Sequence, residues 1–168
     1  MHLFVDADSC PKQAREMVIR FSRRLAMETI FVANRPIPGI NGELTVMELC
    51  PQHDGAADDR IVQLARPGDL VLTRDLPLAE RLVEAGVAVL DDRGRLFTAE
   101  NIRERRSIRD FVVALAENGQ ETERTASYGK KDLEALANSL DRELTRLLKT
   151  SNSTNPIKRP PDTGSVSA

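Results

Sequence analysis

Short apolar runs that alternate with segments of helical periodicity constrain the fold of this chain more than any other feature. The runs cover residues 2–6, 29–33, 44–49, 70–73 and 87–90. They are rich in β-branched and aromatic residues and carry near-continuous apolar runs, as expected for parallel strands that are buried on both faces. We therefore expect an α/β fold with three α/β/α layers around a central, mainly parallel sheet of about five strands.

Helices in the first half of the chain are predicted from capping residues and apolar spacing. Pro11 suits the first turn of a helix, because its missing N–H has no partner there in any case. Asp54 is expected to cap a second helix. A third follows Pro77 and ends at Gly86, since glycine commonly terminates helices.

Two longer helices are expected in the second half. Thr98 can cap the first, over about residues 99–117, and the second covers about residues 131–148. Apolar residues three and four positions apart predict one buried stripe on each helix. The first stripe consists of Ile108, Phe111, Val112 and Leu115, and the second of Leu133, Leu136, Leu140, Leu144 and Leu147. The second stripe packs either against the body of the protein or against another subunit, which would make the chain a homo-oligomer.

Length and composition favour one soluble domain. The chain has 168 residues, of which 40% are hydrophobic and 30% charged, and its formal charge is -2, so no global charge attracts nucleic acid or membranes. It shows no membrane-spanning stretch, no secretory leader and only two cysteines, so we expect a cytoplasmic protein without a membrane partner. Residues 149–168 hold few apolar side chains. We expect a domain over residues 1–148 and a disordered tail after it.

Aspartates follow the predicted strands at the points where those strands end. They are Asp6 and Asp8 after the first strand, Asp58 and Asp59 in the helix after the third, Asp75 after the fourth, and Asp91 and Asp92 after the fifth. Carboxyl ends of parallel strands share one edge of a sheet, so these acids should converge. Crowded carboxylates repel one another, and oxygen ligands favour Mg²⁺ or Mn²⁺. The implied chemistry is metal-assisted attack of water on a phosphodiester.

Most of these acids also have a structural interpretation. Acids at positions such as Asp58 are stabilised by the dipole of a helix start, and Asp75 can be an N-cap. Asp91, which precedes "DRG", can belong to a turn and is the weakest candidate for a fourth acid. Asp6 is harder to explain in this way, because it continues a buried strand, where an unpaired charge is costly.

Several blocks resemble known families. "VDAD", "AADDRIVQLA" and "VLTRDLPLAERLVEAGVAVL" resemble, in order, the acidic motifs of PIN-like nucleases. "VDADSCP", "FVAN", "DGAADDRIV" and "PGDLVLTRDLPLA" resemble the YaiI/YqxD family of small bacterial proteins, over about residues 2–148. The resemblance implies a PIN-like fold, whereas the activity of the family is unassigned.

The resemblance also implies roles for individual residues. Catalytic residues would be Asp6, Asp59 and Asp75, and metal ligands Asp6, Asp8, Asp58, Asp59 and Asp75. Thr73 matches the hydroxyl of the "T-x-D" motif. Many PIN-like nucleases have a glutamate in the middle of the set, where this chain offers only the pair Asp58 and Asp59, so the choice between these two stays open.

Substrate contacts are expected from Asn34, Thr73, Arg105 and Arg109. Asn34 ends the second strand at the same edge, and the two arginines lie one helical turn apart and could hold phosphates. A turn residue and a solvated helix face are the respective alternatives. Cys10 is expected to be a packing residue, since no histidine accompanies it.

The leading functional hypothesis is a metal-dependent nuclease, with RNA as the expected substrate. One alternative is a PIN-like module that binds metal, RNA or a protein partner without catalysis. Another is a phosphatase of the haloacid-dehalogenase type, in which Asp6 would be the nucleophile and Asp8 a general acid. The chain has no lysine between Thr73 and Asp91, which counts against the phosphatase.

Overall fold

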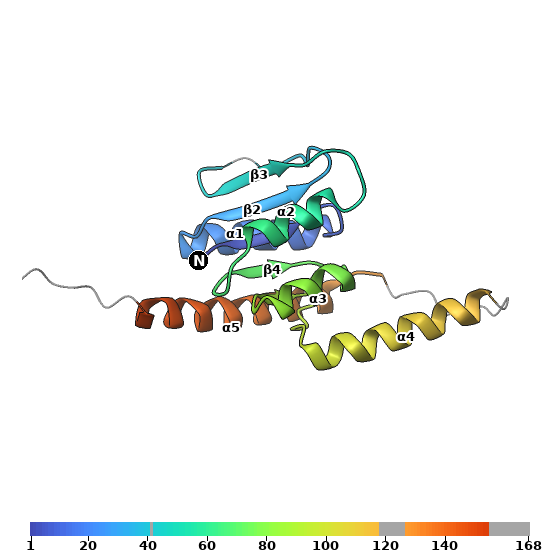
Figure 1. Cartoon of the computed structure of the whole chain (residues 1–168). Coiled ribbons are helices and arrows are strands. Elements are labelled where there is room, and N and C mark those ends of the chain that lie inside the picture. Colours follow the sequence, from blue (N-terminus) through green and yellow to red (C-terminus); the bar gives the residue numbers. More distant parts are fainter. Residues whose placement is uncertain (41, 118–126, 155–168) are drawn as a thin grey trace, which may run out of the picture.

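A five-stranded, all-parallel sheet forms the centre of the protein (Figure 1). The computed structural model describes residues 1–40, 42–117 and 127–154. The strands are β1 (Leu3–Asp6), β2 (Thr29–Ala33), β3 (Thr45–Leu49), β4 (Leu70–Leu72) and β5 (Ala88–Leu90), in the spatial order β3-β2-β1-β4-β5. The predicted α/β fold class is confirmed.

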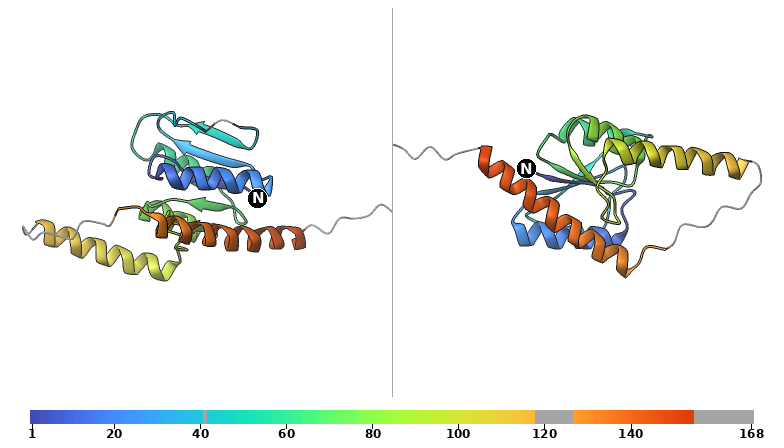
Figure 2. Two further views of the ribbon diagram at one scale, coloured as in Figure 1. Left: turned by 180° about the vertical axis from the view of Figure 1, so that it is seen from behind. Right: turned by 90° about the horizontal axis from the view of Figure 1, so that it is seen from below.

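Helices cover both faces of this sheet (Figures 1 and 2). They are α1 (Lys12–Leu25), α2 (Ala56–Leu64), α3 (Leu76–Glu84), α4 (Ala99–Glu117) and α5 (Lys130–Thr154). One core joins the sheet to α1 and α5, with Val5, Val18 and Leu140 fully buried. The other joins it to α2 and α3, through Phe4 and Ile61 among others. Burial on both faces explains why the central strands β1 and β4 are almost uninterruptedly apolar.

Alternation along β1 determines which helices each side chain meets. Leu3 and Val5 belong to the core under α1 and α5, and Phe4 belongs to the core under α2 and α3. Asp6 has the same parity as Phe4, so its carboxylate points to the layer of α2 and α3. The chain runs from β1 outward to β2 and β3, and then returns to β4 on the other side of β1. Strand order therefore reverses beside β1, where open α/β sheets form their crevices.

The start of α2 differs from the prediction. Its N-cap is Gly55, which has a left-handed backbone at φ 79° and makes no side-chain capping bond, so Asp54 does not cap it. The sharp turn requires a residue that tolerates positive φ, and glycine does so without strain. Asp58 and Asp59 occupy the first turn instead, where their negative charges interact favourably with the positive end of the helix dipole.

The predicted buried stripe of α4 is wrong. Ile108 is 56% exposed and Phe111 is 64% exposed, and Val112 is also exposed. Helix α4 packs on α3 through its opposite side, where Arg106 donates two hydrogen bonds to Glu80 at 2.8 and 2.9 Å. Beyond this contact α4 extends away from the body (Figure 2). Apolar spacing established the helix but could not show whether a neighbour covers that face.

The stripe of α5 packs within the chain. Leu136, Leu140 and Leu144 are fully buried, in the same core as residues of α1. Of the two alternatives for this stripe, packing against the body is therefore observed. The helix continues to Thr154, past its predicted end, and the rest of the predicted tail, residues 155–168, lies outside the described residues. No helix in the described part of the chain is both long and apolar enough to cross a membrane.

Candidate functional site: an acidic crevice

Asp6 is held by two hydroxyl groups at the end of β1. Its Oδ2 accepts hydrogen bonds from Ser9 Oγ at 2.7 Å and from Thr73 Oγ1 at 2.8 Å. The side chain is buried, and this burial raises its pKa despite the two bonds. Both hydroxyls bind the same oxygen, which leaves Oδ1 without a side-chain donor among the described residues.

Thr73 connects Asp6 to Asp75. The Thr73 hydroxyl donates to Asp6 and accepts the backbone N–H of Asp75 at 3.0 Å. Asp75 then caps α3, because its Oδ1 accepts the N–H of Leu78 at 2.8 Å. Thr73 is 1% exposed and its hydroxyl is engaged in both directions. It therefore positions the two acids, and its predicted contact with a substrate gains no support from these bonds.

Asp58 is the third member of this group. Its pKa is raised to about 6, first by burial and then by the negative charges of Asp75 and Asp6. Asp59 turns to α3 instead, where its carboxylate accepts a hydrogen bond from Arg81 Nη2 at 2.8 Å. The geometry thus favours Asp58 over Asp59 beside Asp6 and Asp75. We call the group of Asp6, Asp58 and Asp75 the acidic crevice.

Asp8 and Asn34 lie beside the crevice and are bonded to each other. The backbone N–H of Asn34 donates to Asp8 Oδ2 at 2.7 Å, and Arg35 Nε lies 3.3 Å from Asp8 Oδ1. The Asn34 amide donates to the carbonyl of His53 at 3.2 Å, while its own Oδ1 is buried without a hydrogen-bond partner. Asp8 is thereby committed to a loop contact, whereas Asn34 keeps one acceptor to offer.

Arg105 contacts an aspartate and a phenylalanine of the same chain. Its Nη2 donates to Asp91 Oδ2 at 3.1 Å, and its guanidinium lies over the ring of Phe97. The other oxygen of Asp91 accepts the backbone N–H groups of Arg93 and Arg95 at 2.9 and 2.8 Å. Asp91 thus belongs to a turn, as its alternative interpretation has it, and the contact of Arg105 with phosphate stays a prediction that its pairing with Asp91 does not favour.

Arg109 lies on α4 and lines a hollow between α3 and α4, together with Pro77, Glu80 and Val113. Nothing in the contacts of this hollow joins it to Asp6 or Thr73. The predicted substrate contact of Arg109 therefore gains no support from its position.

Sequence reasoning missed Ser9 at the carboxyl edge, and it gave Asp92 no role apart from that of its neighbour Asp91. The signal for Ser9 was its place three residues after Asp6, a spacing at which hydroxyls bond back to an aspartate in turns. Asp92 is 3% exposed and faces the layer of α1 and α5, and Tyr128 donates its hydroxyl to the Asp92 carbonyl at 2.8 Å. Strand alternation puts it on the same side as Leu90.

Cys10 is a packing residue, as predicted. It lies in the core under α1 and α5, and burial raises the pKa of its thiol to about 12. The charge of nearby Asp92 adds to this effect. A thiol of this kind stays protonated and unreactive at neutral pH.

The carboxylate oxygens of the acidic crevice are ligands of the kind that hard cations prefer, but the three carboxylates do not yet surround a common point. Within the described ranges, no three His, Cys, Asp or Glu side chains lie together closely enough to hold one ion. Mg²⁺ needs less than that, since it keeps several waters and is commonly bound by one or two carboxylates. Asp6 Oδ1 and the second oxygen of Asp75 are the atoms best placed to serve, with Asp58 beside them.

Neutralising Asp58 is expected to stabilise the fold at neutral pH. Its pKa is about 6 in the folded protein against an ordinary value of 3.8, so the folded state loses stability as the pH rises through this interval. We expect Asp58→Asn to raise the free energy of unfolding by about 1 kcal/mol at pH 8, because the site is partly solvated, and to have no such effect below pH 4.

Urea unfolding at pH 8 and at pH 3.5 to 4 measures this difference. Asp110→Asn, on the exposed side of α4, is the matched control. An equal change for Asp58→Asn at both pH values would contradict the repulsion described here.

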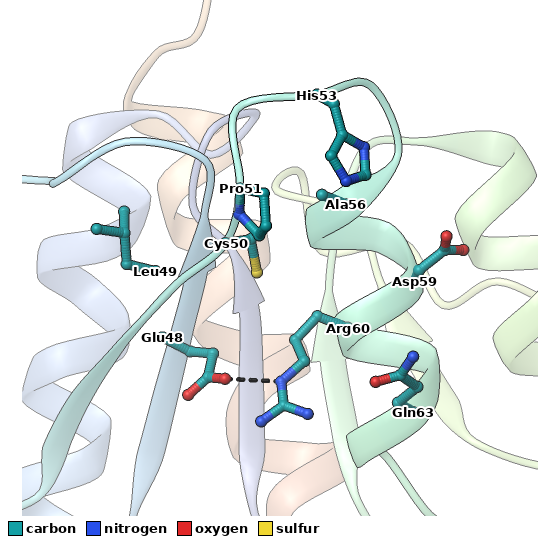
Figure 3. A pocket seen from close by; sticks show the side chains of 9 residues that line it. All are labelled: Glu48, Leu49, Cys50, Pro51, His53, Ala56, Asp59, Arg60 and Gln63. Carbon is teal, nitrogen blue, oxygen red and sulfur yellow. Dashed lines mark hydrogen bonds and ion pairs between the residues drawn. The ribbon is translucent and has the colours of Figure 1, made fainter.

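A hollow lies between α2 and the end of β3 (Figure 3). Cys50, Pro51 and His53 are among its lining residues. Glu48 and Arg60 face each other across it and are joined at 2.6 Å. His53 also lines the hollow that contains Asp8 and Asn34, so the two hollows flank the start of α2.

Comparison with known proteins places the chain among bacterial proteins of one family. A family model described as "Uncharacterized BCR, YaiI/YqxD family" matches residues 4–146. A "UPF0178 protein" of Treponema pallidum (strain Nichols) is 46% identical over 149 residues, which are 89% of this chain and 84% of that protein. A "UPF0178 protein" of Myxococcus xanthus (strain DK1622) is 43% identical over 152 residues, which are 89% of this chain and 98% of that protein. No solved structure matches the chain significantly.

Proposed function

The chain belongs to the YaiI/YqxD family, and we propose that this member is a divalent-metal-dependent nuclease that hydrolyses phosphodiesters of RNA at the acidic crevice. The relatives carry no name that states an activity. The proposal therefore rests on the chemistry of the site.

One observation carries the proposal: the acids of the crevice have no cationic partner, whereas the acids around it do. The neighbouring pairs are Asp8 with Arg35 at 3.3 Å, Asp59 with Arg81 at 2.8 Å, Asp91 with Arg105 at 3.1 Å and Asp92 with Arg74 at 3.7 Å. Among the described residues, Asp6, Asp58 and Asp75 form no ion pair. Partly buried carboxylates that repel one another and form no ion pair are characteristic of functional sites that receive a cation.

Mg²⁺ or Mn²⁺ bound here would supply activation of a water molecule and neutralisation of charge on the leaving oxygen. The protein's part is to hold the ligands. Ser9 and Thr73 fix the orientation of the Asp6 carboxylate, and the α3 cap fixes Asp75. Outer partners of this kind commonly change metal affinity or activity by about 10–100-fold when they are removed.

The order of these acids supports a PIN-like identity for the site. Asp6 ends β1, and Asp58 lies in the first turn of α2. Two loop residues separate Asp75 from Leu72, the last residue of β4. This resembles the order of acids in PIN-like nucleases, with aspartate in the middle place. A phosphatase of the haloacid-dehalogenase type is less well supported, because Asp8 is bonded to Asn34 and Arg35 and not free to act as a general acid.

The test is incubation of the purified protein with RNA and DNA oligonucleotides in Mg²⁺, Mn²⁺ or excess EDTA. We expect cleavage of RNA that requires the metal. Cleavage of none of these substrates, together with metal binding at the crevice, would replace this proposal by the non-catalytic binding module.

A further inference from the structure

We infer that Arg74 forms a phosphate-binding site at the rim of the acidic crevice, with buried Asp92 as its anchor. The substrate follows from the proposed function: the ligand is a backbone phosphate of the RNA strand that enters the crevice. Arg74 and Asp92 take no part in the hydrogen bonds among Asp6, Thr73 and Asp75, so this site has contacts of its own.

Arg74 differs from the other arginines near the acids. Arg35, Arg81 and Arg105 each lie within 3.3 Å of an aspartate oxygen, at 3.3, 2.8 and 3.1 Å, so each of them is paired closely with an acid. The Nε of Arg74 is 3.7 Å from Asp92 Oδ2, which is too far for a hydrogen bond. In the described part of the chain, the guanidinium of Arg74 has no hydrogen-bond acceptor.

Asp92 gives this arginine a fixed direction. Its side chain is 5% exposed and its Oδ2 is buried without a hydrogen-bond partner. Burial raises the pKa of Asp92, and the charge of Arg74 acts in the opposite direction. A buried carboxylate oxygen that lacks a donor is costly, and the nearby charge of Arg74 compensates part of that cost. The stem of Arg74 is thus attracted inward, while 52% of its side chain remains exposed.

Arg74 stands between two residues of the crevice in the chain, while its side chain turns to Asp92 on the side of α1 and α5. Its neighbours in sequence are Thr73, which bonds Asp6, and Asp75, which caps α3. A strand whose scissile phosphate lies at the acids would bring an adjacent phosphate to this rim. The planar guanidinium can bind phosphate oxygens through two parallel N–H donors, and a cation is needed here because the crevice itself is acidic.

Binding of single-stranded RNA in excess EDTA, where no cleavage occurs, tests the site separately from catalysis. In fluorescence anisotropy at low salt we expect Arg74→Gln to weaken binding about tenfold, and to reduce the slope of log K against log salt by about 0.7, the value for one phosphate contact. Arg74→Lys should show the salt slope of the wild type but only part of its affinity. Lysine keeps the positive charge but lacks the two parallel N–H donors of the guanidinium. Asp92→Asn should weaken binding less than Arg74→Gln does.

Arg20→Gln, on the exposed side of α1, is the matched control and should bind RNA as the wild type does. Unchanged affinity and slope in Arg74→Gln would overturn the inference, and so would a wild type that does not bind RNA. Binding that depends on Arg74 in a protein that never cleaves RNA would uphold this site and refute the nuclease. Cleavage by the wild type, together with unchanged binding in Arg74→Gln, would uphold the nuclease and refute the phosphate site at Arg74.

Discussion

Asp6→Asn and Asp75→Asn are each expected to reduce metal-dependent cleavage of RNA by about a hundredfold or more, the upper range for loss of even an outer partner of a metal site. The amide keeps the size of the side chain and removes the negative charge that would hold a cation. Asparagine at position 6 can still accept hydrogen bonds from the hydroxyls of Ser9 and Thr73, which donate to Asp6 in the native protein. Initial rates in Mn²⁺, with circular dichroism to verify folding, measure the effect.

Two matched aspartates separate the crevice from its surroundings. Asp8→Asn and Asp59→Asn remove carboxylates that are paired with Arg35 and Arg81, and we expect each to retain most of the activity. Asp58→Asn should lose it. If Asp59→Asn were inactive and Asp58→Asn active, the choice between these two acids would be wrong, and full activity in Asp6→Asn would refute the site as a whole.

Gly94→Ala is expected to destabilise the fold by about 3 kcal/mol or more, because strain and steric overlap act together. Gly94 has φ 78°, and a Cβ at this position would lie 2.4 Å from the carbonyl oxygen of Ala135 in α5. Ser139 of α5 also donates to the carbonyl of Gly94 at 2.6 Å. A side chain here would push α5 off the turn after β5.

Gly68→Ala is the control for this substitution. Gly68 also has positive φ, at 99°, but a Cβ there would meet no atom within 4 Å. Only the backbone strain applies, and we expect a loss of about 1 kcal/mol. Urea unfolding of both variants distinguishes the two effects. Similar losses in the two would mean that the close approach of α5 to Gly94 is not maintained in solution.

The fold could be predicted because its signals are local. β1 and β4 are buried on both faces, so their apolar runs stand out in sequence, and Pro11 and Gly86 mark helix limits that the structure retains closely. The exposed stripe of α4 could not be foreseen. An apolar residue such as Phe111 records the periodicity of a helix, and whether another element covers it depends on the direction in which α4 leaves the body.

The candidate site could be predicted to its edge of the sheet but not to its members. Parallel strands bring Asp6 and Asp75 to one edge, which follows from topology alone. The choice between Asp58 and Asp59 depends on the rotation of α2, because adjacent residues of a helix point about 100° apart. Arg105 was expected to contact phosphate and Arg74 was not considered, and only their contacts with Asp91 and Asp92 distinguish the two arginines.

The exposed face of α4 bears on experiments with the purified protein. Apolar side chains such as Ile108 and Phe111 face solvent, and exposed apolar patches promote association between copies or with other proteins. Activity and RNA binding should therefore be compared at several protein concentrations, so that effects of association are not attributed to the acidic crevice.

Anomalous diffraction from a crystal of the wild-type protein soaked in Mn²⁺ tests the central claim most directly. We predict a peak at the acidic crevice, in contact with Asp6 and Asp75 and next to Asp58, and no such peak in Asp6→Asn. A wild-type crystal with no Mn²⁺ at these carboxylates, under conditions in which the protein cleaves RNA, would contradict the account.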